Sequence, residues 1–239
     1  MITKFTVLDS NLVSISILDS FNEELKLILE SIDSGTIFSS GLYSKADFRN
    51  LLESFVKGQR GSLGKTKKEG SWSIVPNDTD MTSDARVDFI FMPTYLVTAI
   101  LSRIFCDYPD IAKSITGYTN ALKKGMKFCS YRDLQGHGYE GDAGAAEALT
   151  ILSIGKVPWL LENNKDFCPE LLKSIQNVVK NMKSRLDSGT ASDEWGCSLQ
   201  EEFSSALETL YIKNDKETYE ALKNADNDKE LIKEEDLKW

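Results

Sequence analysis

Helices of two kinds alternate along this sequence, and the alternation limits the folds that the chain can adopt. In one kind, as in residues 110–128 and 170–186, apolar residues recur at steps of three and four and form a single stripe. In the other kind, as in residues 143–154, small or apolar residues occupy nearly every side. A striped helix is covered on one side, whereas a helix that is apolar all round is covered on every side. The sequence therefore predicts an all-α fold with covered helices inside and striped helices outside.

The alternation occurs three times. Each copy has a striped helix, a loop with glycine, aromatic and acidic residues, and a more apolar helix. The three copies are residues 46–56, 70–88 and 94–105; residues 110–128, 136–142 and 143–154; and residues 170–186, 193–196 and 199–212. Units of this kind, here 43 to 60 residues long, bury their apolar faces only by stacking on one another. We therefore expect repeated helical hairpins.

The first copy carries a motif that resembles a known family. Gln59, followed by Gly70-Ser71-Trp72, resembles the Gln…Gly-x-Trp repeat of the terpenoid-cyclase and protein-prenyltransferase family. Residues Thr94–Leu101 are similar to the Thr-x-x-Ala-Leu start of that family's inner helices. The resemblance extends over residues 45–212 and implies an α/α toroid, in which inner and outer helices form concentric rings. The chain is short for a complete ring, so we expect a partial one.

The chemistry of that family does not carry over to this chain. The acidic Asp-x-Asp-Asp motif of the cyclases is absent, and Asp78-Thr79-Asp80 is the nearest match. Zinc-ligand spacing is missing as well, since the cysteines lie far apart and His137 is the only histidine. The wide spacing of Gln59 and Gly70 implies an inserted segment between them. We therefore expect the scaffold alone to carry over, with no metal and no cofactor.

Composition narrows the partners and the compartment. A net charge of −9 disfavours nucleic acid and anionic membranes, because both are bound through clustered Lys and Arg. No run approaches the roughly 18 apolar residues of a membrane span, and the N-terminus lacks a signal-peptide pattern. The four cysteines suit buried thiols in a reducing compartment. We expect a cytoplasmic protein with a helical domain over residues 1–212. A charged segment over residues 213–239 follows, for which we expect a short solvated helix near residues 219–222 and a weakly packed acidic tail.

Acidic side chains gather in the loops that precede the apolar helices. In a toroid these loops surround one mouth of the central cavity, where Asp84, Asp88, Glu140 and Asp142 can converge. Converging carboxylates act as acid and base at a glycosidic bond, or they bind a hard cation through oxygen. The alternative is that each acid caps the N-terminus of a helix, a role that suits Asp142.

Two further residues of the second copy are candidates for catalysis. His137 lies between two glycines, which allow the backbone to approach a ligand closely, and it titrates near neutral pH. The alternative is a surface histidine. Glu147 lies one turn into an apolar helix, so its carboxylate either faces a cavity or pairs with a cation such as Arg86 or Arg132. The catalytic candidates are therefore His137, Glu140, Glu147, Asp84 and Asp88.

Aromatic residues lie where the loops meet the helices, namely Trp72, Tyr95, Tyr139 and Trp195. Together with Asp142 they are the candidates for binding a ligand, and the alternative for each aromatic ring is packing in the core. The sequence thus predicts a pocket for a small carbohydrate-like or isoprenoid-like molecule at an acidic rim. Its chemistry would be that of a hydrolase, a lyase or a cyclase-related enzyme. The alternative function is a non-catalytic scaffold that binds a protein or peptide.

Overall fold

The computed structural model of the chain describes residues 2–7, 15–61, 69–74, 90–131, 141–193 and 195–214. Within these residues the secondary structure is helical, apart from an isolated antiparallel bridge between Ser192 and Ser198. The helices are α1 (Ile15–Asp33), α2 (Lys45–Gly58), α4 (Met92–Asp107), α5 (Pro109–Lys113), α6 (Tyr118–Tyr131), α7 (Gly141–Ile154), α8 (Val157–Asn163), α9 (Pro169–Asp187) and α10 (Gln200–Asn214). The predicted all-α class is confirmed.

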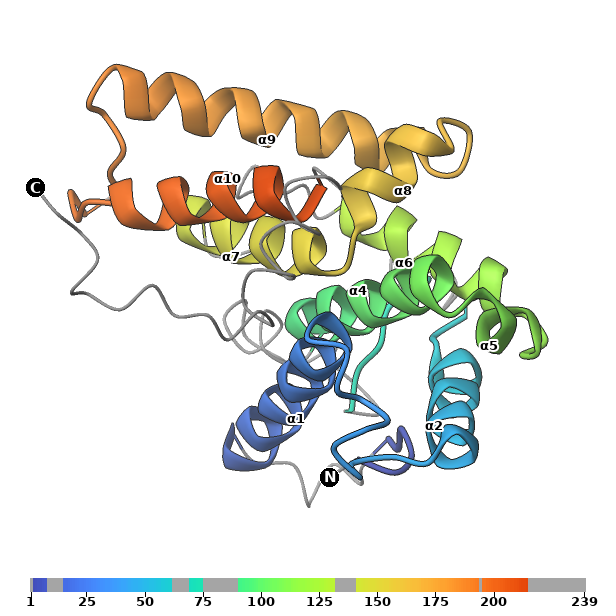
Figure 1. Cartoon of the computed structure of the whole chain (residues 1–239). Coiled ribbons are helices and arrows are strands. Elements are labelled where there is room, and N and C mark those ends of the chain that lie inside the picture. The colour runs from blue at the N-terminus through green and yellow to red at the C-terminus, as the bar shows by residue number, and fades with distance from the viewer. Residues whose placement is uncertain are drawn as a thin grey trace, which may run out of the picture.

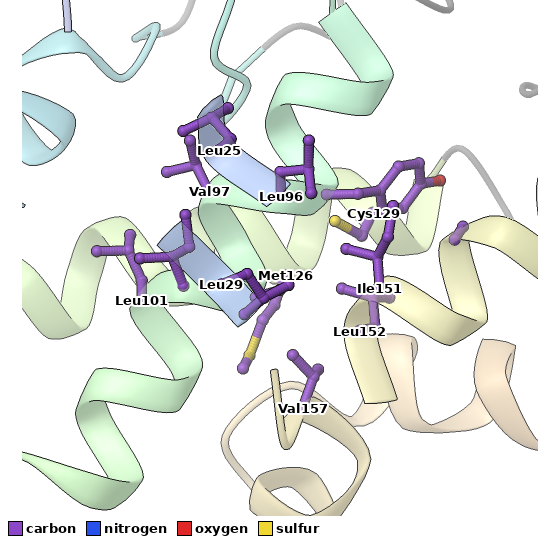
Figure 2. Packing of buried hydrophobic residues seen from close by; sticks show 14 of the residues in the cluster. Leu25, Leu29, Leu96, Val97, Leu101, Met126, Cys129, Ile151, Leu152 and Val157 are labelled. Carbon is purple, nitrogen blue, oxygen red and sulfur yellow. The ribbon is translucent and has the colours of Figure 1, made fainter. Parts of the chain in front are cut away.

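Helix α4 is the centre of the fold. All of its residues from Met92 to Ile104 are buried, which confirms that this segment is covered on every side. It packs against α1, α5, α6, α7 and α8. Figure 2 shows the apolar side chains of α1, α6, α7 and α8 meeting those of α4. An apolar stretch with no polar face leaves the helix no side that is stable in water, so the other helices surround it.

The long helices form two rows, and α4 belongs to the inner one. In the inner row, α1 packs on α4, α4 on α7, and α7 on α10. In the outer row, α2 packs on α6, and α6 packs on α9. The rows touch where α6 meets α4 and where α9 meets α10, and Figure 1 shows α9 lying along α10. The striped helices α2, α6 and α9 thus make up the outer row.

Several helix ends coincide with local capping or stop signals in the sequence. The hydroxyl oxygen of Ser44 accepts a hydrogen bond of 3.1 Å from the backbone N–H of Asp47, so Ser44 caps α2. Pro169 occupies the first turn of α9, where its missing N–H costs nothing. Gly35 has a φ of +71° just beyond α1, and this left-handed conformation ends the helix.

One expectation about the elements is corrected. The single helix predicted over residues 110–128 is divided into α5 and α6, because Gly117 has a φ of +83°, which a right-handed helix cannot contain. Two short helical pieces flank the longer helices: α8 follows α7 and has a proline in its first turn, and Ile90 and Phe91 are helical just before α4.

The motif around Gln59 fixes the segment after α2 to α6. The side-chain amide of Gln59 donates hydrogen bonds to the carbonyl oxygens of Gly70, at 3.0 Å, and Ala121, at 2.7 Å. The backbone N–H of Arg60 donates to the carbonyl of Ser71, and the N–H of Gly70 donates to the carbonyl of Arg60, each at 2.9 Å. The two ends of the inserted residues are therefore held together beside α6.

A buried arginine joins the carboxyl ends of the inner row. Arg103 is 2% exposed, and its guanidinium lies 2.9 Å from the carboxylate of Asp33, the last residue of α1. It also pairs with Asp107 at the end of α4, and it donates a hydrogen bond of 3.0 Å to the carbonyl oxygen of Ile154, the last residue of α7. Lys213, near the end of α10, pairs with Asp33 as well. The four helices therefore bring their carboxyl ends to one place.

The described helices can be compared in length and composition with a membrane span. No single helix there is long and apolar enough to cross a bilayer, and only α7 and α8 meet the criterion together, as a pair bent by 66°. Their apolar side chains are largely used inside the protein, since Leu149, Leu152, Leu160 and Leu161 are all buried.

Helix α10 ends at Asn214 and the following residues lie outside the described part, so the boundary at residue 213 stays a prediction.

Replacing Arg103 tests the junction of the helix ends. We expect Arg103→Met to lower the free energy of unfolding by about 1–3 kcal/mol, because it removes the bonds of a buried guanidinium to Asp33 and Asp107 and leaves the carbonyl oxygen of Ile154 without this donor. Arg103→Lys keeps the charge but loses the fork of donors, so its loss should be smaller. Urea unfolding followed by circular dichroism measures both changes.

The matched control is Arg49→Met, which removes a partly exposed arginine paired with Glu53 at 2.8 Å. A pair of this kind contributes about 0–1 kcal/mol, so the control should unfold almost as the wild type does. Equal losses for Arg103→Met and Arg49→Met would contradict the role assigned to Arg103.

Candidate functional site

A cavity of about 500 Å³ lies against the inner row, and residues of α1, α4, α7 and α10 line it. Helix α7 forms one wall along nearly its whole length, from Ala143 to Ile154. The volume is within the range of small-molecule sites, about 300–1,000 Å³. A larger hollow of about 960 Å³ lies between α8, α9 and α10, but none of the predicted site residues lines it. We take the inner cavity as the candidate site because Glu147 is part of its wall.

Small residues at the start of α7 leave the space for this cavity. Ala143, Gly144 and Ala146 line it, at positions where longer side chains would fill it. Leu29 of α1 and Leu96 of α4 line it as well. Among the described residues that form the wall there is no aromatic ring. The cavity is thus aliphatic over much of its surface.

Charged groups give part of the wall of this largely aliphatic cavity a negative charge. The carboxylate of Glu147, whose side chain is 45% exposed, lies 3.7 Å from the ammonium of Lys26 on α1. Glu30 of α1 and Glu202 of α10 also line the cavity. Among the described residues, three carboxylates therefore share the wall with one lysine, and that lysine also bonds to Glu23 at 3.2 Å. Such a wall attracts a cationic group.

Both sequence-based alternatives for Glu147 are found together, because it lines the cavity and also has a basic partner. That partner is Lys26, on the first helix of the chain. The partners suggested by the sequence, Arg86 and Arg132, lie outside the described residues. Helix α7 is therefore not covered on every side, since Ala143 and Glu147 are exposed at the cavity.

Asp142 pairs with Arg185 of α9. The same guanidinium donates a hydrogen bond to the carbonyl of Ser192 and lies 5.2 Å from the centre of the Phe203 ring on α10. The amino end of α7 is thereby held against α9, α10 and the loop between them. In the described structure the carboxylate of Asp142 supports the fold, and its role in ligand binding stays a prediction.

Trp72 and Tyr95 are packed inside the protein. Both are fully buried, and neither lines the inner cavity. The indole N–H of Trp72 donates a hydrogen bond of 2.8 Å to the carbonyl of Phe55, and its backbone N–H donates to the hydroxyl of Thr94 at 2.9 Å. A side chain at Gly125 of α6 would come within 2.8 Å of the indole ring. These contacts favour core packing, the alternative stated for these rings.

Trp195 has the opposite environment, since it is 81% exposed on the loop between α9 and α10. Asp193 shapes that loop, because its carboxylate accepts the backbone N–H groups of Trp195 at 2.9 Å and Cys197 at 2.7 Å. Trp195 does not line the inner cavity. A ligand role for its ring stays a prediction.

The other predicted site residues lie outside the described part of the chain, namely Asp84, Asp88, His137, Tyr139 and Glu140. Their roles stay predictions. Sequence reasoning missed Lys26, Glu30 and Glu202. Each is a charged residue on a helix with many other charges, so only the packing of α1 and α10 beside α7 distinguishes them.

The cysteines add no activated nucleophile to the cavity. Burial raises the pKa of Cys106 to about 12, and it also raises the pKa values of Cys129 and Cys168. A thiol with a raised pKa is mostly protonated and reacts slowly. Cys197 is exposed, which corrects the expectation that the cysteines are buried. Within the described residues, no group of three or more His, Cys, Asp or Glu side chains is arranged to hold a metal ion.

These environments predict one reactive thiol in the native protein. With Ellman's reagent at pH 8, we expect Cys197 to react quickly and the other three cysteines only after denaturation, because burial blocks access and raises their pKa values. The released thiolate, measured by absorbance, counts the thiols. Cys197→Ser is the control and should remove the fast phase. A second native thiol that reacts equally fast would contradict this placement.

Comparison with known proteins gives no match, whether to a protein family, a curated protein or a solved structure. The resemblance to the terpenoid-cyclase and protein-prenyltransferase family therefore rests on the motif around Gln59 and Trp72. What the structure establishes is an all-α protein with a cavity against its inner row of helices.

Proposed function

We propose that the chain is part of an α/α toroid and binds a small aliphatic ligand between α1, α4, α7 and α10. The two rows of helices support the toroid, because α4, α7 and α10 of the inner row each follow a striped helix, α2, α6 and α9, of the outer row. The hydrogen bonds of Gln59 and the burial of Trp72 against α6 support it as well. The proposal covers binding. Hydrolase, lyase or cyclase-related chemistry stays a prediction.

The wall of the cavity favours one of the two expected ligand classes. A carbohydrate presents many hydroxyl groups, and each loses water on binding unless a polar partner replaces it. The described wall of the cavity has more apolar surface, from residues such as Leu29, Leu96 and Ile151, than polar surface, from groups such as Glu147 and Thr150. An aliphatic chain gains free energy there in proportion to the apolar area that it removes from water. We therefore favour an isoprenoid-like ligand over a sugar.

The observation that carries the proposal is the carboxylate of Glu147 beside the aliphatic part of the wall. With Glu30 and Glu202 it places negative charge next to the apolar surface, and Lys26 is the one basic residue among the described residues of this wall. A ligand with a hydrocarbon tail and a cationic head satisfies both parts of the wall. Glu147 is the group that we assign to the head.

A scaffold that binds a protein or peptide is the second candidate. The larger groove between α8, α9 and α10 is the feature that favours it, because an apolar groove of this kind takes an amphipathic helix. The two functions use different surfaces, so variants of the inner cavity distinguish them.

Geranylamine and geraniol test the proposed ligand class, since they share an isoprenoid tail and differ in the charge of the head. We expect geranylamine to bind more tightly than geraniol, and methyl β-glucoside not to bind, in isothermal titration calorimetry. Glu147→Gln should weaken geranylamine binding about fivefold, because a partly exposed charge pair contributes up to about 1 kcal/mol. Geraniol binding should not change.

Glu208→Gln is the matched control, because Glu208 is exposed on α10 and does not line the cavity. Ala143→Leu fills part of the cavity and should weaken both geranyl compounds. Binding of the glucoside alone would replace the isoprenoid class by a carbohydrate class. Equal affinity of geranylamine for wild type, Glu147→Gln and Ala143→Leu would contradict the site, as would no binding of either geranyl compound.

A further inference from the structure

The groove between α8, α9 and α10 has a shape that suits the binding of a helix. Along α9 its wall is one helical face from Leu172 to Asp187, a length of about 22 Å at the rise of an α-helix. Leu172, Ile175 and Val179 give this face an apolar floor. Leu172 and Val179 are only half-buried in the described structure, although they pack against the core. The floor therefore leaves apolar surface available to a further segment.

The last described helix of the chain, α10, ends beside this groove. Leu210 and Tyr211 of α10 line it, and α10 ends at Asn214. The ring of Tyr211 lies 4.8 Å from the ammonium of Lys183, which lines the groove from α9. Twenty-five residues, 215–239, follow in the sequence. A segment that begins within a few residues of the groove has a high effective concentration there.

We propose that residues 216–226 occupy this groove within the same molecule. Tyr219 and Leu222 are spaced by three residues, so in a helix they lie on one face and can both contact the apolar floor. Eleven residues span about 16 Å as a helix, which is shorter than the face of α9 that lines the groove. The closeness of this segment to the groove in the sequence and its length as a helix are therefore both consistent with the proposed position.

Charge does not oppose this occupant. Lys180 and Lys183 line the groove together with Glu162 and Asp187, so the wall carries both signs. Residues 216–226 also carry both signs, with three acidic residues and two lysines. Each surface therefore offers partners to the charges of the other, in pairs that salt weakens.

The order of the helices points to the same occupant. Within the described residues, α4 and α7 are each followed within three residues by another helix, α5 and α8, that packs against them. Helix α10 is the last helix of the described part. A segment after α10 that packs beside α9 continues this order.

Substitution in the full-length chain tests the contact. Leu222→Asp places a charge where the segment meets the apolar floor, and Leu237→Asp is the matched control in the same segment. We expect Leu222→Asp to raise the fluorescence of 8-anilinonaphthalene-1-sulfonate at least twofold, because the groove becomes open to the dye, and to lower the Tm by a few degrees. Leu237→Asp should leave both values near those of the wild type.

A disulfide tests the position directly. In a Cys197→Ser background, the pair Gln176→Cys and Leu222→Cys should form an intramolecular disulfide on mild oxidation, read by peptide mass spectrometry. The pair Gln176→Cys and Leu237→Cys should form much less. Gln176 is exposed and lines the groove, so its replacement leaves the core intact.

Two results would overturn the proposal. One is that the variants at Leu222 and Leu237 give the same dye fluorescence and the same yield of disulfide, which leaves the groove to another protein. The other is a disulfide found between two chains, or a mass from sedimentation equilibrium that falls from dimer to monomer with Leu222→Asp. Either observation assigns the groove to a second copy of the chain.

Discussion

The guanidinium of Arg103 is the contact on which the arrangement of the inner row depends. The carboxyl end of a helix has carbonyl oxygens without partners and a partial negative charge, so several such ends meeting in one place need a cation with several donors. Arginine offers five N–H donors in a fixed plane. Arg103 uses them on Asp33, Asp107 and the carbonyl of Ile154, at the ends of α1, α4 and α7. A lysine or an apolar residue could not satisfy these groups together.

The inner cavity results from contacts that fix helices at both ends of the inner row. Arg103 holds the carboxyl ends, and the pair of Arg185 with Asp142 holds the amino end of α7 against α9 and α10. Protein interiors are otherwise close-packed, so a gap persists only where the surrounding helices cannot move together to fill it. Between these two anchored ends, α7 presents Ala143, Gly144 and Ala146. The cavity is therefore a consequence of rigid ends and small side chains.

The sequence predicts the parts of this structure that depend on local patterns. Stripes and apolar runs predicted the helices, and Ser44 predicted the start of α2, because these features act within a few residues. The break at Gly117 was missed because the apolar stripe continues across it from Ile115 to Tyr118. Glu147 could be singled out since a lone acid in an apolar helix is unusual. The other acids of the cavity could not, because a charged residue on a striped helix looks like a solvent-exposed residue until the helices pack.

The two hollows of the protein differ in origin, and the difference bears on function. The inner cavity is bordered by four helices whose carboxyl ends are fixed to one another, and its wall combines aliphatic surface with carboxylates. The larger groove lies beside the last described helices, with half-buried apolar side chains along one face of α9. A groove of that kind is what an array of stacked helices has wherever the next element has not been added. The larger groove thus borders the last described helices, whereas the smaller cavity is formed by the inner row. Under our proposal residues 216–226 cover this groove and keep a peptide out of it, which leaves the inner cavity as the candidate functional site.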